Sequence, residues 1–391
     1  MQTLDGRRWR TLVFGLALAA LASRCVLALG HFGDSADLSI YTYFGGFVAR
    51  GINPYHVPPL PSAGGAVADE PIFEFVLYAG LLRIWDSPTT LRLFFAACDA
   101  ATIIVIGLFL PRTRRWRLAA IAFLGFSPLP LLAWSYIPED KSLILLLLVI
   151  TIAAAERACD GVAWITTGLL AAVKWMGPFF AVPLLVEGLR RTGKKVLAPM
   201  LLGGTIAALS TLPFFPDSLL TLARRSTRFN SPPMFDSLTI LLADLHLYQP
   251  LLLRLWLTGA FIAVAVLHAR RIIDIGEAIV LGSVSMFVFL PDEPADRILL
   301  VSMMLMLVTR PRWFTWWIAS LLPATIVFVD YTFSLDHVLR RLIGRPESWQ
   351  HVIGANLLLL TIAASYLIDR AYARGRLPIV SRSSLQQNRR D

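Results

Sequence analysis

Two aspartates, Asp34 and Asp37, follow the first apolar run of the chain and lie three residues apart. Residues 36–50 carry apolar side chains at helical spacing, which predicts a helix at a membrane interface with the acids at its start. A carboxylate there could act as a general base, and a second one could orient a reactant or raise the base's pKa. The alternative is structural, with one aspartate capping the helix and the other a solvated charge.

Basic residues near the predicted outer ends of apolar runs could bind a phosphate group. They are Lys141, Arg297 and the RRSTR cluster with Arg224, Arg225 and Arg228. The cluster could equally attract anionic lipid headgroups. Lys174 lies inside an apolar segment, where a lysine is costly and should face a cavity or a carboxylate partner. We predict that Lys174 also serves the phosphate, with a structural ion pair as the alternative.

Two acidic turns also lie near the predicted outer ends of apolar runs. Glu139 and Asp140 adjoin Lys141, and the turn 291–297 contains Glu293 and Arg297. A solvated helix start is the commoner explanation of such turns. Because both turns are expected on the same membrane face as Asp37, we predict that they line one cleft with it.

Motifs for metals and nucleotides are absent from the sequence. The two aspartates could hold a divalent cation, but two carboxylates alone are weak evidence for a metal. The six histidines show no HxxxH or HExxH spacing, and the three cysteines form no CxxC pair. The segment 191–195, RTGKK, lacks the upstream glycine of a phosphate-binding loop. We predict no cofactor, no metal site and no disulfide.

Composition sets the class of protein that positions these residues. Of 391 residues, 56% are hydrophobic and 16% are charged, against about 25% charged in a soluble domain. The net charge of +10 lies in short basic clusters between apolar runs, as expected for the cytoplasmic turns of a membrane protein. The sequence therefore predicts an integral membrane protein with no nucleic-acid partner.

Apolar runs predict an all-α membrane bundle of about ten spans, a single domain over 1–391. The runs cover 11–30, 90–110, 116–136, 141–155, 196–214, 250–268, 275–291, 297–310, 313–330 and 349–369. Residues 162–189 are too few for two spans, which predicts a re-entrant helix pair. Residues 71–85 are expected to form a partial helix on the outer side. The basic clusters then place both termini and the tail 370–391 in the cytoplasm, and the first loop, 31–70, outside.

Several segments together resemble the integral-membrane glycosyltransferases of the GT-C superfamily, in particular the polyprenyl-phosphate-mannose-dependent mannosyltransferases. Asp37, Tyr41 and the GINPY segment at 51–55 match the first loop of that group. The segment 91–101, with Arg92 and Asp99, is similar to its second or third span. The segments 127–148 and 168–185 resemble later parts of the group. The similarity covers roughly the first half of the chain.

The resemblance implies transfer of a sugar, with inversion, from a polyprenyl phosphate to a lipid-linked or glycan acceptor at the non-cytoplasmic face. We expect the membrane to be the cell membrane. The resemblance also implies that Asp37 is the base. Because Asp34 lies three residues earlier on the expected helix, we expect it to be a supporting acid. The residues expected to line the cleft are Tyr41, Asn53, Tyr55, Glu70, Glu139, Asp140 and Glu293. The chain departs from the group at 69–75, DEPIFEF, where many relatives carry a Tyr or Lys with two prolines. Acids there replace that contact or cap the next helix.

A transporter or lipid flippase without covalent chemistry is the competing interpretation. Re-entrant helices and charged residues within spans are typical of transporters as well. Against it, the two halves of the sequence show no internal repeat, and the acids gather in one loop after one span.

Overall fold

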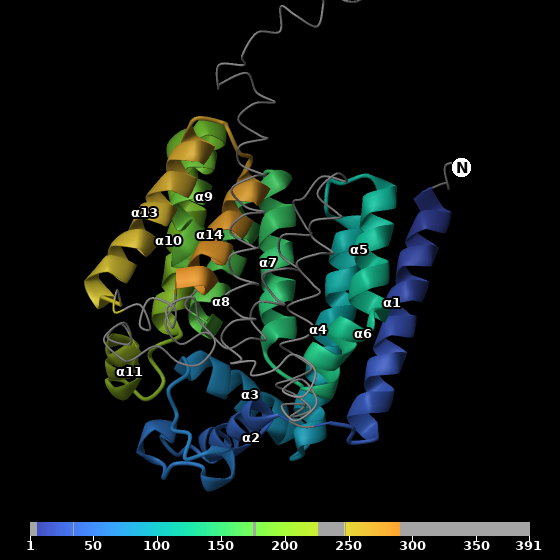
Figure 1. The fold of residues 1–391 in the computed structure, drawn as a ribbon, viewed down its shortest axis with the longest axis vertical. Helices are drawn as coiled ribbons and strands as arrows, with labels where there is room; N and C mark the ends of the chain where they lie inside the picture. Colours follow the sequence, from blue (N-terminus) through green and yellow to red (C-terminus); the bar gives the residue numbers. More distant parts are fainter. Residues whose placement is uncertain (1–5, 34, 175–176, 226–245, 247, 290–391) are drawn as a thin grey trace, which may run out of the picture.

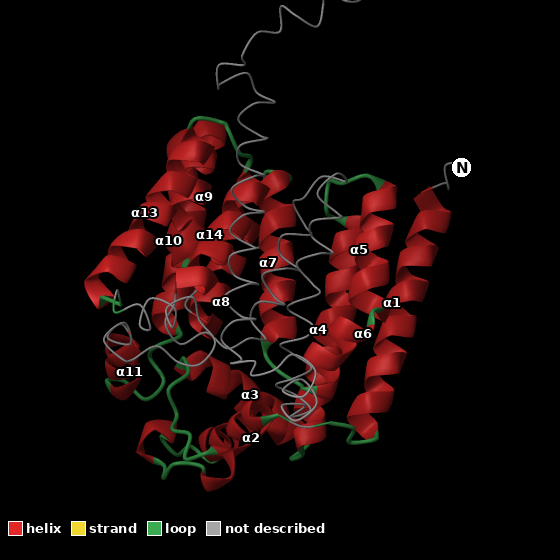
Figure 2. Cartoon of the chain, viewed as in Figure 1, coloured by secondary structure: helices red, strands yellow, loops and turns green. Residues whose placement is uncertain are grey.

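The computed structural model describes residues 6–33, 35–174, 177–225, 246 and 248–289. Within these ranges the chain forms helices and turns and no β-strand, which confirms the all-α class (Figure 2). The helices are α1 (Gly6–Leu29), α2 (Ala36–Ala49), α3 (Ile72–Ile84), α4 (Pro88–Leu108), α5 (Arg114–Phe126), α6 (Pro128–Leu131), η3 (Leu132–Tyr136), α7 (Lys141–Glu156), α8 (Asp160–Lys174), α9 (Pro178–Thr192), α10 (Leu197–Leu209), α11 (Asp217–Arg225), α13 (Pro250–Ala269) and α14 (Ile275–Phe289). Short 3-10 turns are η1 (Pro54–His56), η2 (Pro61–Ala63) and η4 (Gly193–Val196).

The helices form an upright bundle with α7 near its middle (Figure 1). On one side of α7 lie α1, α4 and α5, and on the other lie α8, α9, α10, α13 and α14. Helices α2 and α3 lie across one end of the bundle, near α11. Helix α7 begins at Lys141 at that end and finishes at Glu156 at the other, about 24 Å away at 1.5 Å per residue. Its apolar side chains are almost all buried, so it forms the core.

Three described helices, α1, α4 and α13, are long and apolar enough to cross a membrane. They coincide with the predicted runs 11–30, 90–110 and 250–268, so the membrane class is supported. The run 116–136 is not one helix, because Pro128 follows Ser127, which adopts the extended backbone that a residue before proline prefers. The chain continues there as α6 and η3. The predicted spans from 297 onward and the tail 370–391 lie outside the described residues.

The predicted re-entrant segment 162–189 falls on α8 and α9, which have 15 residues each. Each is about 22 Å long, whereas the hydrocarbon core of a bilayer is about 30 Å thick. Helix α8 packs so closely on α10 that a Cβ on Gly168 would overlap the carbonyl oxygen of Gly203. Small residues at such crossings let helix backbones approach in membrane proteins.

A buried ion pair joins α1 to α4. The Nε of Arg24 lies 2.7 Å from Oδ2 of Asp99, and its other nitrogens donate to carbonyl oxygens of Ala20, Leu124 and Gly125. All three nitrogens of this fully buried guanidinium donate to acceptors, as a charge inside a bundle requires. The pair therefore fixes α1, α4 and α5 against one another.

Candidate functional site

The loop after α1 is fixed by contacts from α4 and η3. Arg92 of α4 donates hydrogen bonds to the carbonyl oxygens of Phe32 (3.0 Å) and Gly33 (2.6 Å). Gly33 has φ of +73°, and a Cβ at this position would overlap the carbonyl oxygen of Tyr136. Glycine is favoured at this φ, and only glycine leaves this space. The chain is therefore held against the turn that precedes α7.

The first turn of α2 presents Asp37. Ser35 caps the helix, because its Oγ accepts from the backbone N–H of Leu38 (2.9 Å), and its hydroxyl donates to the carbonyl oxygen of Pro138 (2.7 Å). Asp37 is thus not the cap, and it lies where the helix dipole favours a negative charge. The hydroxyl of Tyr41, one turn later, donates to Asp37 Oδ2 (3.4 Å). The Asp37 side chain is 38% exposed, so a reactant can reach it.

Lys141, the first residue of α7, connects Asp37 to the acidic turn. Its Nζ lies 3.6 Å from Asp37 Oδ2 and 3.9 Å from Asp140 Oδ1, and it forms a close ion pair with Glu139. The lysine is only 5% exposed. A buried ammonium group among three carboxylates orients them and offsets their repulsion. The predicted convergence of Asp37 with the turn at 138–141 is thus present in the fold.

Lys174, at the end of α8, lies close to three carboxylates, one of which also contacts Lys141. Its Nζ lies 2.9 Å from Glu70 Oε1, 3.0 Å from Asp140 Oδ2 and 3.8 Å from Glu74 Oε2. Asp140 therefore lies between the two lysines and joins their contacts into one group. We call the seven residues Asp37, Glu70, Glu74, Glu139, Asp140, Lys141 and Lys174 the acid–lysine cluster. It contains more carboxyl than ammonium groups, so it is an acidic centre.

Glu74 and Asp140 are the two most buried acids of the acid–lysine cluster. Burial raises the pKa of Glu74 well above its ordinary value, and the charges of Asp140 and Glu70 raise it further. Lys174 and the hydrogen bond from the Tyr78 hydroxyl (2.8 Å) lower it, but their effect is smaller. Glu74 therefore holds its proton more tightly than a glutamate in water does.

Glu74→Gln should flatten the dependence of stability on pH. Because the pKa of Glu74 is higher in the folded than in the unfolded chain, where it is near 4.5, the free energy of unfolding falls as the pH rises from that value. Glutamine cannot ionise and can still accept from Tyr78, so the variant should be at least as stable as wild type at pH 8. Thermal unfolding in detergent between pH 5 and 9 measures this. The exposed Asp86→Asn serves as control, and an unchanged pH slope in Glu74→Gln would contradict the assignment.

Asn53 and Tyr55 shape the loop around the acid–lysine cluster. Asn53 Oδ1 accepts from the backbone N–H of Tyr55 (3.1 Å), and its Nδ2 donates to Asp217 Oδ2 (2.7 Å) at the start of α11. His56 Nε2 also lies 3.1 Å from Asp217. The hydroxyl of Tyr55 donates to the carbonyl oxygen of Glu70 (3.2 Å). Tyr55 thus supports Glu70 at the cluster, whereas Asn53 attaches α11 to the first loop.

The remaining predicted residues are distributed differently. Arg224 lies exposed near the end of α11, which Arg225 completes. Asp34, Arg228, Glu293 and Arg297 lie outside the described residues, as does the side chain of Arg225. Their predicted roles stay predictions.

Glu74 and its partner Tyr78 were missed as site residues by sequence reasoning. The available signal was a glutamate in a short apolar helix, which requires a partner as Lys174 does. Glu70 pairs with Lys174 in the turn before α3. Among the described residues, no group of three or more His, Cys, Asp or Glu side chains is arranged to hold a metal ion.

Chemically, the acid–lysine cluster can accept a proton at Asp37 and hold polar groups of a ligand beside it. Its reactive side is the partly exposed carboxylate, and its buried side is a network of ion pairs that fixes α2, α3, α7 and α8.

A scan of the sequence against protein-family models gives no match, and a search of curated proteins finds no similar sequence.

Proposed function

We propose that the protein is a membrane glycosyltransferase that moves a sugar, by our first choice mannose, from a polyprenyl phosphate to a lipid-linked or glycan acceptor. The observation that supports this best is the geometry of Asp37. It is a partly exposed carboxylate at a helix start, with Tyr41 and Lys141 fixed around it. The resemblance of Asp37, Tyr41 and the segment 51–55 to GT-C transferases supports the same activity.

In the proposed reaction, Asp37 takes the proton of the acceptor hydroxyl as its oxygen attacks the anomeric carbon of the sugar. The bond from that carbon to the phosphate oxygen breaks, and the lipid phosphate leaves with the electron pair. Attack from the side opposite to the phosphate inverts the anomeric configuration. Lys141 keeps the Asp37 carboxylate in position, while Glu70 and Glu139 provide acceptors for sugar hydroxyls. Asp140, which was also expected to line the cleft, is fully buried and serves instead to hold the two lysines.

The departing phosphate needs cations to stabilise it. The acid–lysine cluster contains two lysines, and both are already paired with carboxylates. Lys141 and Lys174 both lie against several carboxylates, so a further negative group beside them would be repelled. We therefore assign most of the phosphate binding to arginines, with Lys141 as the contact nearest Asp37. The candidates are Arg224, Arg225, Arg228 and Arg297.

We also propose the membrane arrangement that this chemistry requires. About ten spans would place the end of the bundle with α2 and α3 on the non-cytoplasmic side, with both termini in the cytoplasm of a cell-membrane protein. Helices α8 and α9 would enter and return, and α3 would stay at the outer boundary. Placement of the basic turns 112–117 and 190–195 at the opposite end from Lys141 supports this orientation.

Transport or lipid flipping is the second candidate function. The observation in its favour is the continuous run of buried charges from Asp37 through Lys141 and Asp140 to Lys174, since such runs also mark proton and substrate pathways. A transporter would use this run without forming a covalent product.

Reconstituted full-length protein separates the two functions. Vesicles containing it are supplied with polyprenyl-phosphate [³H]mannose and a polyprenyl-linked glycan acceptor on one side only. A transferase gives a labelled acceptor and free polyprenyl phosphate, with the new linkage inverted relative to the donor. Movement of the labelled donor to the other leaflet without any product would reject the transferase and support the transporter.

A further inference from the structure

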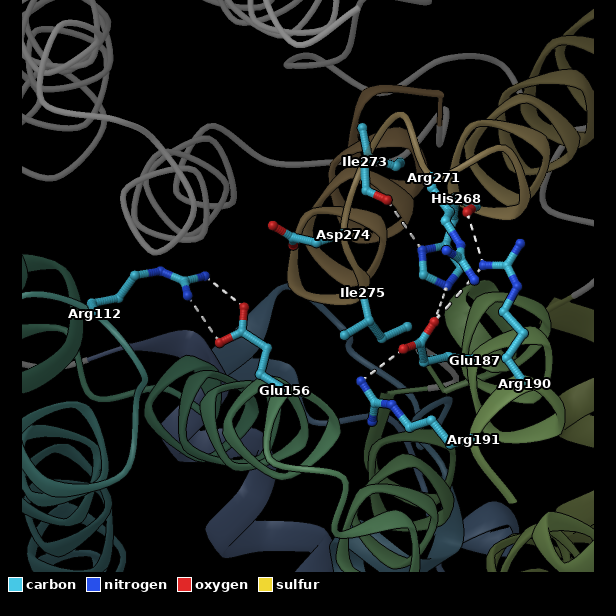
Figure 3. A pocket seen from close by; sticks show the side chains of 10 residues that line it. All are labelled: Arg112, Glu156, Glu187, Arg190, Arg191, His268, Arg271, Ile273, Asp274 and Ile275. Atoms are coloured by element: carbon cyan, nitrogen blue, oxygen red, sulfur yellow. Dashed lines mark hydrogen bonds and ion pairs between the residues drawn. The ribbon is translucent and has the colours of Figure 1, made fainter. Parts of the chain in front are cut away.

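A polar pocket opens at the end of the bundle opposite to the acid–lysine cluster (Figure 3). It has a volume of about 510 Å³ and is formed by the last turns of α7, α9 and α13, the start of α14 and the turn before α5. Four arginines from three segments line it: Arg112, Arg190, Arg191 and Arg271. The pocket is separated from Lys141 by the length of α7, so it is independent of the proposed reaction.

The carboxylates of the pocket are each engaged by neighbouring groups. Glu156 accepts two hydrogen bonds from Arg112, at 3.0 and 2.6 Å. Glu187 lies 2.8 Å from a nitrogen of Arg191 and 3.2 Å from Nε2 of His268. The third acid, Asp274, accepts from a backbone N–H at the start of α14 and so caps that helix. The acids are thus used within the protein.

Two arginines keep donors for an external group. Arg190 uses one nitrogen on the carbonyl oxygen of His268 (3.2 Å) and another on that of Ala269, and Glu187 is 3.8 Å away, beyond hydrogen-bond distance. The guanidinium of Arg271 has no hydrogen bond or ion pair among the residues that the structure describes. A guanidinium carries five N–H donors in a planar fork that suits the oxygens of a phosphate.

The backbone of Arg271 indicates that its side chain has a use. Arg271 follows the C-cap of α13, with φ of +59°, and its N–H bonds the carbonyl oxygen of His268 (2.8 Å). Glycine is favoured at this position because other residues are strained in the left-handed conformation. An exposed arginine there lowers stability, and its position beside His268 at the pocket offers a compensating role (Figure 3).

We propose that this pocket binds the phosphate of an anionic membrane phospholipid, with Arg271 and Arg190 as its donors. Helix α13 is long and apolar enough to span a membrane and ends at Ala269, so Arg271 follows the apolar segment directly, at the depth of lipid headgroups. Fixed arginines at that depth suit the phosphate of a phospholipid headgroup. The phosphate can bind the arginines while the acyl chains of the lipid stay in the bilayer.

Native mass spectrometry of the full-length protein in detergent tests this proposal, with phosphatidylglycerol and phosphatidylcholine as probes. Wild type should bind one phosphatidylglycerol in preference to phosphatidylcholine. Arg271→Gly should weaken that binding about fivefold, the effect of one basic residue on an anionic lipid. Because glycine relieves the strained backbone, the thermal stability of the lipid-free variant should be equal or higher, which excludes unfolding as the cause.

Arg10→Gln is the matched control, because Arg10 is an exposed arginine near the start of α1, outside the pocket but at the same end of the bundle. It should bind phosphatidylglycerol as wild type does. Equal binding of the two lipids, or unchanged binding in Arg271→Gly, would overturn the proposal. A third arm offers sn-glycerol 3-phosphate, and competition by this soluble phosphate at the concentration of the lipid would reject a membrane lipid as the source.

Discussion

Asp37→Asn is expected to lower turnover by about 10²- to 10⁴-fold while leaving donor affinity nearly unchanged, because asparagine keeps the size of the side chain but cannot accept a proton. The partner groups remain satisfied, since Lys141 keeps Glu139 and Asp140 and Tyr41 can still donate to the amide oxygen. The measurement is the initial rate of sugar transfer with purified protein at saturating donor.

Two comparisons make this result specific. Asp34→Asn should lower the rate less and mainly weaken acceptor binding, because Asp34 is assigned a supporting role. Asp86→Asn, at an exposed position between α3 and α4, should behave as wild type. Full activity of Asp37→Asn would reject Asp37 as the base. Loss of thermal stability together with activity would instead mean that Asp37 is structural, so unfolding is measured beside the rate.

Lys174→Met is expected to lower the free energy of unfolding by about 3–5 kcal/mol, because it removes the cation and leaves buried carboxylates uncompensated. Glu74 and Asp140 are fully buried beside it, and Glu70 is only 14% exposed. Chemical unfolding in mixed micelles measures the change.

The double variant Lys174→Met/Glu70→Gln gives the matching test. Removing one of the carboxylates with the lysine should restore part of the lost stability, which a double-mutant cycle reports as a coupling energy. Lys194→Met, at an exposed site in the 3-10 turn after α9, should change stability little. If Lys174→Met were as stable as Lys194→Met, the ion pairs around Lys174 would contribute nothing to the fold.

Local features of this fold were predictable from the sequence. Tyr41 follows Asp37 by four residues, so a helix brings their polar ends together, and the two groups lie 3.4 Å apart. The expectation that Lys174 would face a carboxylate followed from the cost of a lone charge in an apolar segment, and it is confirmed. Arg24 and Asp99, two charges within apolar runs, likewise pair inside the bundle.

Partners far apart in the sequence were not predictable. Glu70 and Glu74 precede Lys174 by about a hundred residues, and their meeting depends on how α3 lies across the end of α8, which no local pattern specifies. Arg92 donates to the carbonyl oxygens of Phe32 and Gly33. Backbone carbonyls carry no sequence signal, so such a contact cannot be read from residue types.

The central claim is that the carboxylate of Asp37 meets the sugar of a polyprenyl-phosphate donor. The most direct test is an electron cryo-microscopy structure of the full-length protein with a polyprenyl phosphonate of mannose, which cannot transfer its sugar. The account predicts the sugar beside Asp37, with room for an acceptor hydroxyl within about 3 Å of the carboxylate, and the phosphonate toward Lys141 and the arginines. A sugar bound out of reach of Asp37, or the phosphonate of the sugar donor held at the opposite end by Arg190 and Arg271, would contradict it.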